Sequence, residues 1–197
     1  LKEKNMADRY QTGVRSQMIY RDKILVARPI LDTNPVFSHS VVYCYEHRDS
    51  GDVFGVILNK PSQFRVSSLG ALKDIKIESH HLDTTVVHKG GPVSDTSILL
   101  LHTSEWTSTN TLHTTGQLAM TSDNLMVEKL GTGNFPKGWR MFAGMSVWTE
   151  SQLDREVKEG AWHVMDTNIH LIFDFNEEEQ YVKAIEYAGS QTFAKFL

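Results

Sequence analysis

Residues 40–58, SVVYCYEHRDSGDVFGVIL, carry the strongest structural signal in this chain. Two runs rich in β-branched and aromatic residues, 40–46 and 53–58, flank a polar segment that contains Gly51. This pattern is typical of a β-hairpin, in which a glycine-containing loop reverses the chain between two strands. Asn59-Lys60-Pro61 follows, and its proline predicts the end of the second strand because proline cannot donate to a sheet ladder.

Short strands and helices are expected to alternate along the rest of the chain without a repeat. Further strands are expected at 24–27, 84–88, 97–102, 139–143, 162–165 and 170–175. Helices are expected at 66–72, from Asp123 to Leu130, after a Thr149 cap, and from an Asn176 cap to Gly189. The Ser- and Thr-rich residues 103–123 are expected to form a long surface loop. These elements predict one α+β domain over residues 21–197.

Residues 1–20 are polar and weakly periodic, and we expect a helical N-terminal arm or a tail there. Met6 is the expected native start, with residues 1–5 as an addition. No basic segment precedes an apolar one as in a secretory signal, and no apolar run approaches the ~20 residues of a membrane span. The expectation is a cytoplasmic protein that does not enter a membrane.

The charge of the chain disfavours direct binding to nucleic acid. Its 197 residues include 20 Lys and Arg against 24 Asp and Glu, a formal net charge of −4. Proteins that bind a duplex concentrate basic residues on one surface, because phosphate neutralisation supplies most of the affinity. Here the basic residues are spread out, and the predicted C-terminal helix begins with the acidic run 177–179.

Cys44 is the single cysteine, which excludes an internal disulfide and a cysteine zinc cluster. It lies inside the apolar run 41–45. One interpretation is a small buried hydrophobic residue, as free cysteines usually are. The alternative is a redox-sensing thiol, but no cationic neighbour in the strand would lower its pKa.

Six short motifs follow one another in order along most of the chain: ILVARPI at 24–30, SHSVVYCYEH at 38–47, GVILNKP at 55–61, GGPV at 90–93, LLLH at 99–102 and AGMSVWTESQL at 143–153. Together they resemble the YqgE/AlgH family of small bacterial proteins. The resemblance implies a branched, mostly antiparallel sheet curled into a partial barrel with flanking helices. It also implies a role as a transcriptional regulator, which the residues do not independently support.

If the fold carries a ligand pocket, the strand ends and the glycine turn are expected to form it. Turn amides and imidazoles supply hydrogen-bonding groups, and strand ends bring distant segments together. The glycine turn also has a purely structural interpretation, since paired glycines permit close backbone approach. The predicted binding residues are Glu46, His47, Asn59, Gly90, Gly91, Pro92 and His102.

The leading functional hypothesis is a non-enzymatic protein that binds a small molecule or a protein partner and thereby acts in regulation. The alternative is a hydrolase that uses His47 or His102 beside the turn at 90–92. No nucleophile elbow, kinase signature or phosphate loop is present, so no catalytic residue is assigned. None of the nine histidines has the spacing of a known metal motif, and neither a metal nor a cofactor is expected.

Overall fold

A computed structural model describes residues 19–77, 79–114 and 116–194. Its strands are β1 (Lys23–Ala27), β2 (Val41–His47), β3 (Asp52–Ile57), β4 (Pro61–Arg65), β5 (Val86–Lys89), β6 (Val93–Thr103), β7 (Thr111–His113), β8 (Leu118–Thr121), β9 (Trp139–Thr149) and β10 (Trp162–Asp166). Its α-helices are α1 (His81–Thr84), α2 (Asn124–Gly131), α3 (Glu150–Lys158), α4 (Ile169–Phe173) and α5 (Glu177–Ala194). Short 3₁₀ turns occupy Pro29–Leu31, Val66–Ser68 and Gly70–Leu72.

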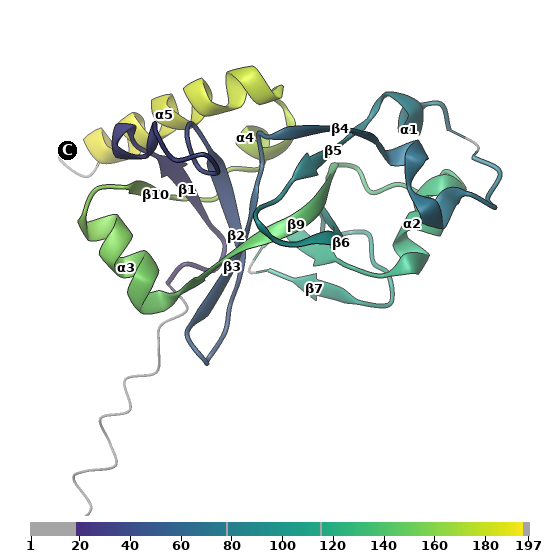
Figure 1. Ribbon diagram of the computed structural model, residues 1–197, viewed down its shortest axis with the longest axis horizontal. Coiled ribbons are helices and arrows are strands. Elements are labelled where there is room, and N and C mark those ends of the chain that lie inside the picture. The colour runs from purple at the N-terminus through teal and green to yellow at the C-terminus, as the bar shows by residue number, and fades with distance from the viewer. Residues whose placement is uncertain (1–18, 78, 115, 195–197) are drawn as a thin grey trace, which may run out of the picture.

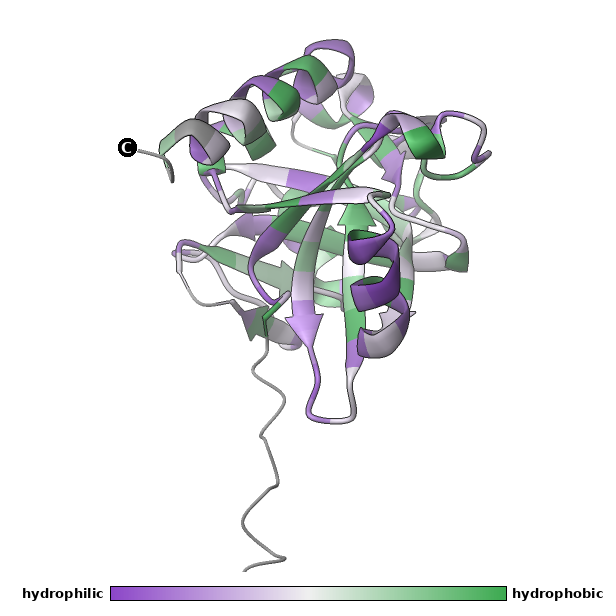
Figure 2. Ribbon diagram, turned by 90° about the vertical axis from the view of Figure 1, so that its left-hand side faces the viewer, coloured by the Kyte–Doolittle hydropathy of each residue, from purple (hydrophilic) through white to green (hydrophobic). Residues whose placement is uncertain are grey.

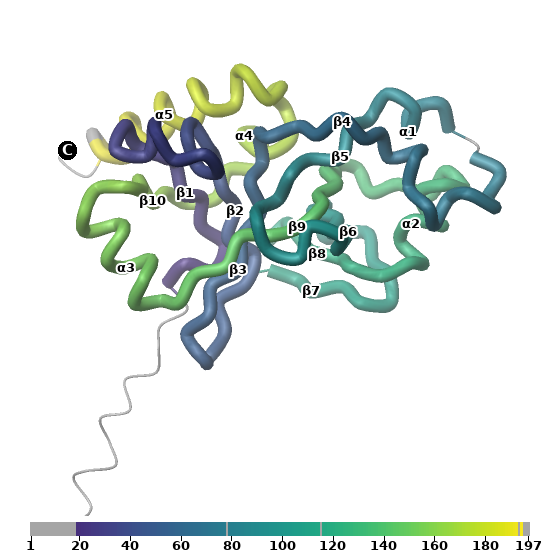
Figure 3. The backbone as a smooth tube through the Cα atoms, in the orientation of Figure 1, coloured from purple at the N-terminus to yellow at the C-terminus, as the bar shows by residue number. Residues whose placement is uncertain are grey.

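The strands form one branched sheet in the order β10-β1-β2-β3-β9-β6-β8-β7. The branch lies on β9, which pairs with β3, β6 and β5, and β5 also pairs with β4. The β5–β9 pairing is parallel, and the other pairings among the described strands are antiparallel. Figures 1 and 3 show β9 running through the middle of the molecule, with the sheet curled on both sides. This half-barrel in a single α+β domain confirms the predicted fold class.

The predicted hairpin is present as β2 and β3, and a β-bulge interrupts it. Cys44 pairs with Gly55 and Glu46 pairs with Phe54, so Tyr45 is an extra residue in β2. The side chains of β2 alternate between two hydrophobic clusters up to this bulge, and Cys44 lies in one and Tyr45 in the other. Adjacent side chains of β2 therefore pack into different hydrophobic clusters.

Helices cover the sheet with one apolar face each. Ala184 and Ala188 of α5 pack into the cluster that also holds Tyr45 and Phe142, while Leu153 of α3 packs into the cluster of Cys44. Figure 2 shows hydrophobic and hydrophilic residues mixed along α5, as expected for a helix with one buried face. Within the described residues, no helix is long and apolar enough to cross a membrane.

The predicted helix starts are confirmed by their caps. The Asp123 carboxylate accepts from the backbone N–H of Met126, and the Thr149 hydroxyl accepts from that of Gln152. The Asn176 side chain accepts from the second and third residues of α5 at 3.1 and 3.0 Å. These bonds satisfy N–H groups that have no partner inside the helix.

Three local expectations were wrong. Residues 103–123 contain β7 and β8 rather than one long loop, because β8 is buried against β6. Residues 169–173 form α4 instead of a strand, and Asn168 caps this short helix. Gly189 does not end α5, which continues to Ala194. The predicted arm or tail at 1–20 lies outside the described residues except for Ile19 and Tyr20.

The Cys44 thiol is predicted to react slowly in the folded protein. Its side chain has no solvent exposure, and burial raises its pKa, so the nucleophilic thiolate is scarce. Labelling with a maleimide at pH 7 should be at least about a hundredfold slower in buffer than in 6 M guanidinium, since access requires opening of the sheet. Equal rates under the two conditions would mean an exposed thiol and would restore the redox-sensor interpretation.

Candidate functional site

The end of β3 and the glycine turn after β5 enclose a cavity of about 350 Å³. We call it the motif cavity, because five of its eight lining residues belong to the segments 55–61 and 90–93. The lining consists of Pro35, Val36, Ile57, Lys60, Pro61, Lys89, Gly91 and Pro92. Two motifs far apart in the sequence thus form one apolar hollow that carries two lysines.

Backbone hydrogen bonds hold the two segments together. The N–H of Ile57 donates to the carbonyl of Gly90 at 2.9 Å, and the N–H of Lys89 donates to the carbonyl of Lys60 at 2.7 Å. The N–H of Gly90 donates to the carbonyl of Ala143 in β9. These main-chain bonds fix the two segments of the cavity wall relative to each other.

The glycine turn lies directly against the backbone of β9. A Cβ atom added to Gly90 would be 2.1 Å from the carbonyl oxygen of Gly144, and one added to Gly91 would be 2.3 Å from the backbone of Met145. No side chain fits in such space, which supports the structural interpretation of both glycines. The same turn lines the cavity, so the structural and the binding interpretations are compatible.

The two lysines of the motif cavity differ in their surroundings. The Lys60 ammonium donates to the carbonyl of Ser38 at 2.6 Å, and partial burial lowers its pKa. Lys89 is exposed, and its ammonium has no hydrogen-bond or ion-pair partner within the described part of the chain. The site therefore presents positive charge beside proline and aliphatic surface, which suits an anion with an apolar body.

Asn59 has a structural role beside this cavity. Its side-chain oxygen accepts from the N–H of Val41, and its side-chain nitrogen donates to the carbonyl of His39, both at 2.9 Å. The buried amide joins the start of β2 to the end of β3. It thereby supports the strand end that carries Lys60.

The structure does not bring the predicted histidines to the motif cavity. His47 pairs with Val53, which pairs with Trp148, whereas His102 pairs with Trp139. These two partners lie nine residues apart on β9, which corresponds to roughly 30 Å along an extended strand. The four predicted segments therefore do not meet in one pocket. Of the predicted residues, only Gly91 and Pro92 line the motif cavity, and Asn59 is represented there by the next residue, Lys60.

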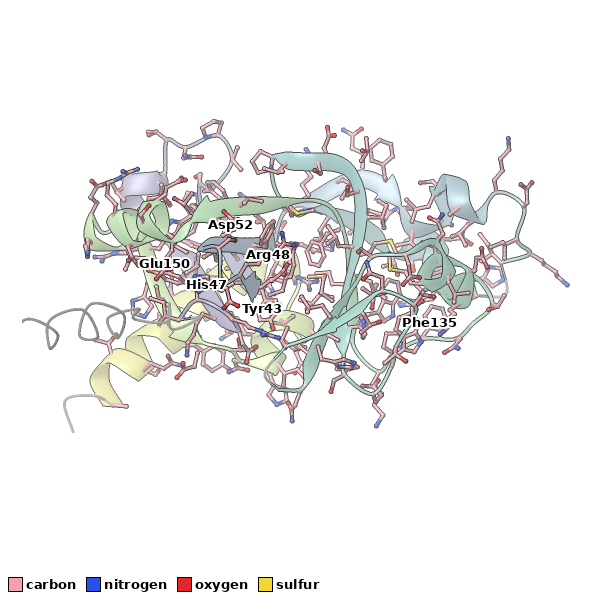
Figure 4. All side chains as sticks on the ribbon, turned by 90° about the horizontal axis from the view of Figure 1, so that it is seen from below. Tyr43, His47, Arg48, Asp52, Phe135 and Glu150 are labelled. Atoms are coloured by element: carbon pink, nitrogen blue, oxygen red, sulfur yellow. The ribbon has the colours of Figure 1, made fainter. Side chains whose placement is uncertain are left out.

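His47 is buried at the end of β2, and Glu46 lies beside the hairpin loop. Nε2 of His47 is 3.4 Å from Oε2 of Glu150, and Figure 4 shows the two residues beside each other. Neither ring nitrogen has a hydrogen bond among the described residues. Glu46 binds the Arg48 guanidinium through both carboxylate oxygens, at 2.8 and 3.1 Å.

His102 is a core residue with both ring nitrogens engaged. Nδ1 contacts the carbonyl oxygen of Thr103 at 2.9 Å, and Nε2 contacts the hydroxyl of Thr121 at 2.8 Å. The ring also packs edge-on against Trp106. Burial lowers the pKa of His102, so the neutral form is favoured.

A second polar cluster ties α5 to the sheet. The buried Arg140 of β9 donates to the carbonyl of Leu58, to the side-chain oxygen of Gln180 and to the carbonyl of Phe175. His88 contacts Glu177 at 2.7 Å. Burial and then the charge of Arg140 lower the pKa of His88. Burial of Glu177 is outweighed by hydrogen bonds from its own backbone N–H and from His88 and by the charge of Arg140, so the pKa of Glu177 is lowered.

Sequence reasoning missed the two lysines of the motif cavity. Each stands close before a proline, in NKP at 59–61 and KGGP at 89–92, and this shared pattern was the available signal. Pro35 and Val36 were missed because they come from a loop whose path depends on distant contacts. The carbonyls of Ser38 and His39 in that loop accept from the Lys60 ammonium and from the Asn59 side-chain nitrogen.

Comparisons with known proteins agree on one group of relatives. The profile of a family described as AlgH-like matches residues 24–192. A UPF0301 protein of Mannheimia succiniciproducens is 32% identical over 176 residues, which cover 88% of this chain and 94% of the relative. A UPF0301 protein of Marinomonas sp. is 29% identical over 86% and 89% of the two chains.

Two solved structures have a similar fold. The solution structure of the AlgH protein from Pseudomonas aeruginosa has a TM-score of 0.70 and 27% identity, covering 83% of this chain and 85% of that one. A crystal structure of a Corynebacterium diphtheriae protein has a TM-score of 0.61 and 24% identity over 77% and 78% of the two chains. The second likeness is one of fold alone.

Proposed function

Since this chain belongs to the AlgH-like family, we propose that it is a cytoplasmic binding protein that acts in regulation through the motif cavity. Its ligand is a small anion with an apolar body, and it does not contact DNA directly. One observation carries this proposal: two sequence motifs meet to form an apolar cavity, and two lysines, Lys60 and Lys89, help to line it.

Charge and shape together favour this class of ligand. A carboxylate or phosphate between two ammonium groups forms charge-assisted hydrogen bonds, which are about twice as strong as neutral ones. Pro61 and Pro92 add rigid apolar surface that loses little entropy on binding. A cavity of about 350 Å³ has the size of a site for a small organic molecule.

Through Lys60, binding of a ligand in the motif cavity would change the conformation of a surface loop. Its ammonium holds the carbonyl of Ser38, in the same loop that supplies Pro35 and Val36. An anion in the cavity competes for that ammonium. Binding would then loosen the loop at 32–40, in which His39 already has a φ of 52°, and alter the surface offered to a protein partner.

The hydrolase alternative has less support. None of the eight residues that line the motif cavity carries a hydroxyl or thiol nucleophile, and neither His47 nor His102 is among them. Both nitrogens of His102 are engaged. An acid–base role for either histidine would need a different pocket from this one.

Titration with hexanoate tests the proposal, monitored by backbone amide NMR shifts of the full chain. We expect shifts at residues 57–60 and 89–91, and a Lys89→Gln variant should bind about tenfold more weakly because it loses one charged hydrogen bond. Lys89 is exposed, so this variant should fold normally.

Lys76→Gln is the matched control, since Lys76 is an exposed lysine that does not line the cavity. It should bind hexanoate like the wild type, and hexylammonium should not bind at all. Shifts at other residues only, or equal affinities of the two lysine variants, would refute the assignment of the site. Shifts with an acidic peptide but not with hexanoate would refute a small-molecule ligand and would indicate a protein partner instead.

A further inference from the structure

A second cavity, of about 310 Å³, lies beside the β2 bulge. Its floor is formed by apolar side chains of β3, β6, β7, β8 and β9, namely Phe54, Leu99, Leu112, Met120 and Met145. We call it the Tyr45 cavity, after the extra residue of the bulge that lines it. It shares no lining residue with the motif cavity.

One wall of the Tyr45 cavity is a preformed flat surface. The Arg48 guanidinium lies over the Phe54 ring, 4.2 Å from its centroid, and both oxygens of Glu46 hold it there. Figure 4 shows Arg48 on the hairpin at a distance from Glu150, which instead lies beside His47. Planar cations and aromatic rings fixed in this way are surfaces on which a planar ligand stacks.

The Tyr45 hydroxyl is the unusual polar group of this cavity. Only 5% of the residue is exposed, and the hydroxyl donates to the sulfur of Met145 at 3.5 Å. A thioether is a weak acceptor, so this buried phenol has a poor partner where buried hydroxyls usually have a good one. Burial raises the pKa of Tyr45, which keeps the hydroxyl protonated as a donor.

Another cavity adjoins this one and shares Leu99, Ser122 and Met145 with it. Its volume is about 390 Å³, and its polar lining comes from Thr96, Ser97 and the start of α2. The Asp123 carboxylate already occupies the N-terminus of that helix, which makes the position unfavourable for an anion. A ligand could therefore extend here with an uncharged polar group.

We infer that the Tyr45 cavity is a binding site for a planar aromatic molecule that carries a carbonyl acceptor. The ring lies between the Arg48–Phe54 surface and the thioethers of Met120 and Met145, and the carbonyl replaces Met145 as the partner of the Tyr45 hydroxyl. Methionines suit such a wall because their flexible thioethers adapt to aromatic rings. This inference is independent of the proposed function, because the two cavities are separate.

Two probes of matched shape test the role of the acceptor. 2-Naphthamide carries a carbonyl and 2-methylnaphthalene does not, and NMR shift titrations of the full chain give both dissociation constants. The wild type should bind the amide at least about fivefold more tightly, as one good hydrogen bond allows. Tyr45→Phe should reduce this ratio to about one without weakening 2-methylnaphthalene.

Tyr43→Phe is the control, because Tyr43 lies on the same strand but donates its hydroxyl to Asp22 and does not line the cavity. It should keep the fivefold preference. Leu112→Trp fills the cavity from a partly exposed position and should abolish binding of both probes. Equal binding of the probes by the wild type, or a preference that survives in Tyr45→Phe, would overturn the inference.

Discussion

Replacing Gly91 by valine is expected to remove about 4 kcal/mol or more of folding free energy, enough to unfold much of the protein. A Cβ at this position would lie 2.3 Å from the carbonyl carbon and oxygen of Met145. These atoms belong to the central strand β9, so they cannot move away without breaking the sheet at its branch point. Urea melts of the wild type and Gly91→Val give the loss directly.

Gly70→Val is the matched control, because no atom lies within 4 Å of a Cβ added at Gly70. It should cost well under about 1 kcal/mol. His102→Ala should fall between the two glycine variants, at roughly 2–3 kcal/mol, since it leaves a cavity and removes one of the two hydroxyl contacts of Thr121. A Gly91→Val protein with the wild-type midpoint would contradict the close approach of the turn to β9.

Arg140→Met is the second change with a large expected effect, a loss of about 3–5 kcal/mol. The guanidinium is buried and donates to two carbonyls and to Gln180, and methionine leaves these acceptors without a donor. Glu177, whose pKa Arg140 helps to lower, also loses a favourable charge. Hydrogen exchange should show that α5 loses protection first, since Gln180 and Glu177 belong to this helix and Phe175 lies just before it.

Arg65→Met provides the comparison for this prediction. Arg65 is exposed and donates to one carbonyl, that of Thr84, so its replacement should cost less than about 1 kcal/mol. Equal midpoints of Arg140→Met and Arg65→Met in urea would show that the buried cluster does not hold α5 in place.

The elements that could be predicted from the sequence are those with local causes. The hairpin follows from two β-branched and aromatic runs around Gly51, and the caps at Asp123, Thr149 and Asn176 depend on residues two or three positions away. The end of α5 could not be predicted in this way. Gly189 has open space around it, and an exposed glycine lowers helix stability without ending a helix that packs along its length.

The candidate site was predictable only where its residues share a segment. The turn at 90–92 was expected. The position of Lys60 beside that turn was not, because it depends on the long-range hydrogen bond from the N–H of Lys89 to the carbonyl of Lys60. The separation of His47 from His102 follows from the register of three strand pairs, which no local pattern specifies. Long-range pairing therefore decided which candidate residues meet.

A crystal structure of the full chain soaked with hexanoate tests the central claim most directly. The carboxylate should lie within about 2.7–3.2 Å of the ammonium groups of Lys60 and Lys89, with its chain against Pro61 and Pro92. The bond from Lys60 to Ser38 should lengthen in the same structure. An empty motif cavity at a saturating concentration of hexanoate, with the bond from Lys60 to Ser38 intact, would contradict the account.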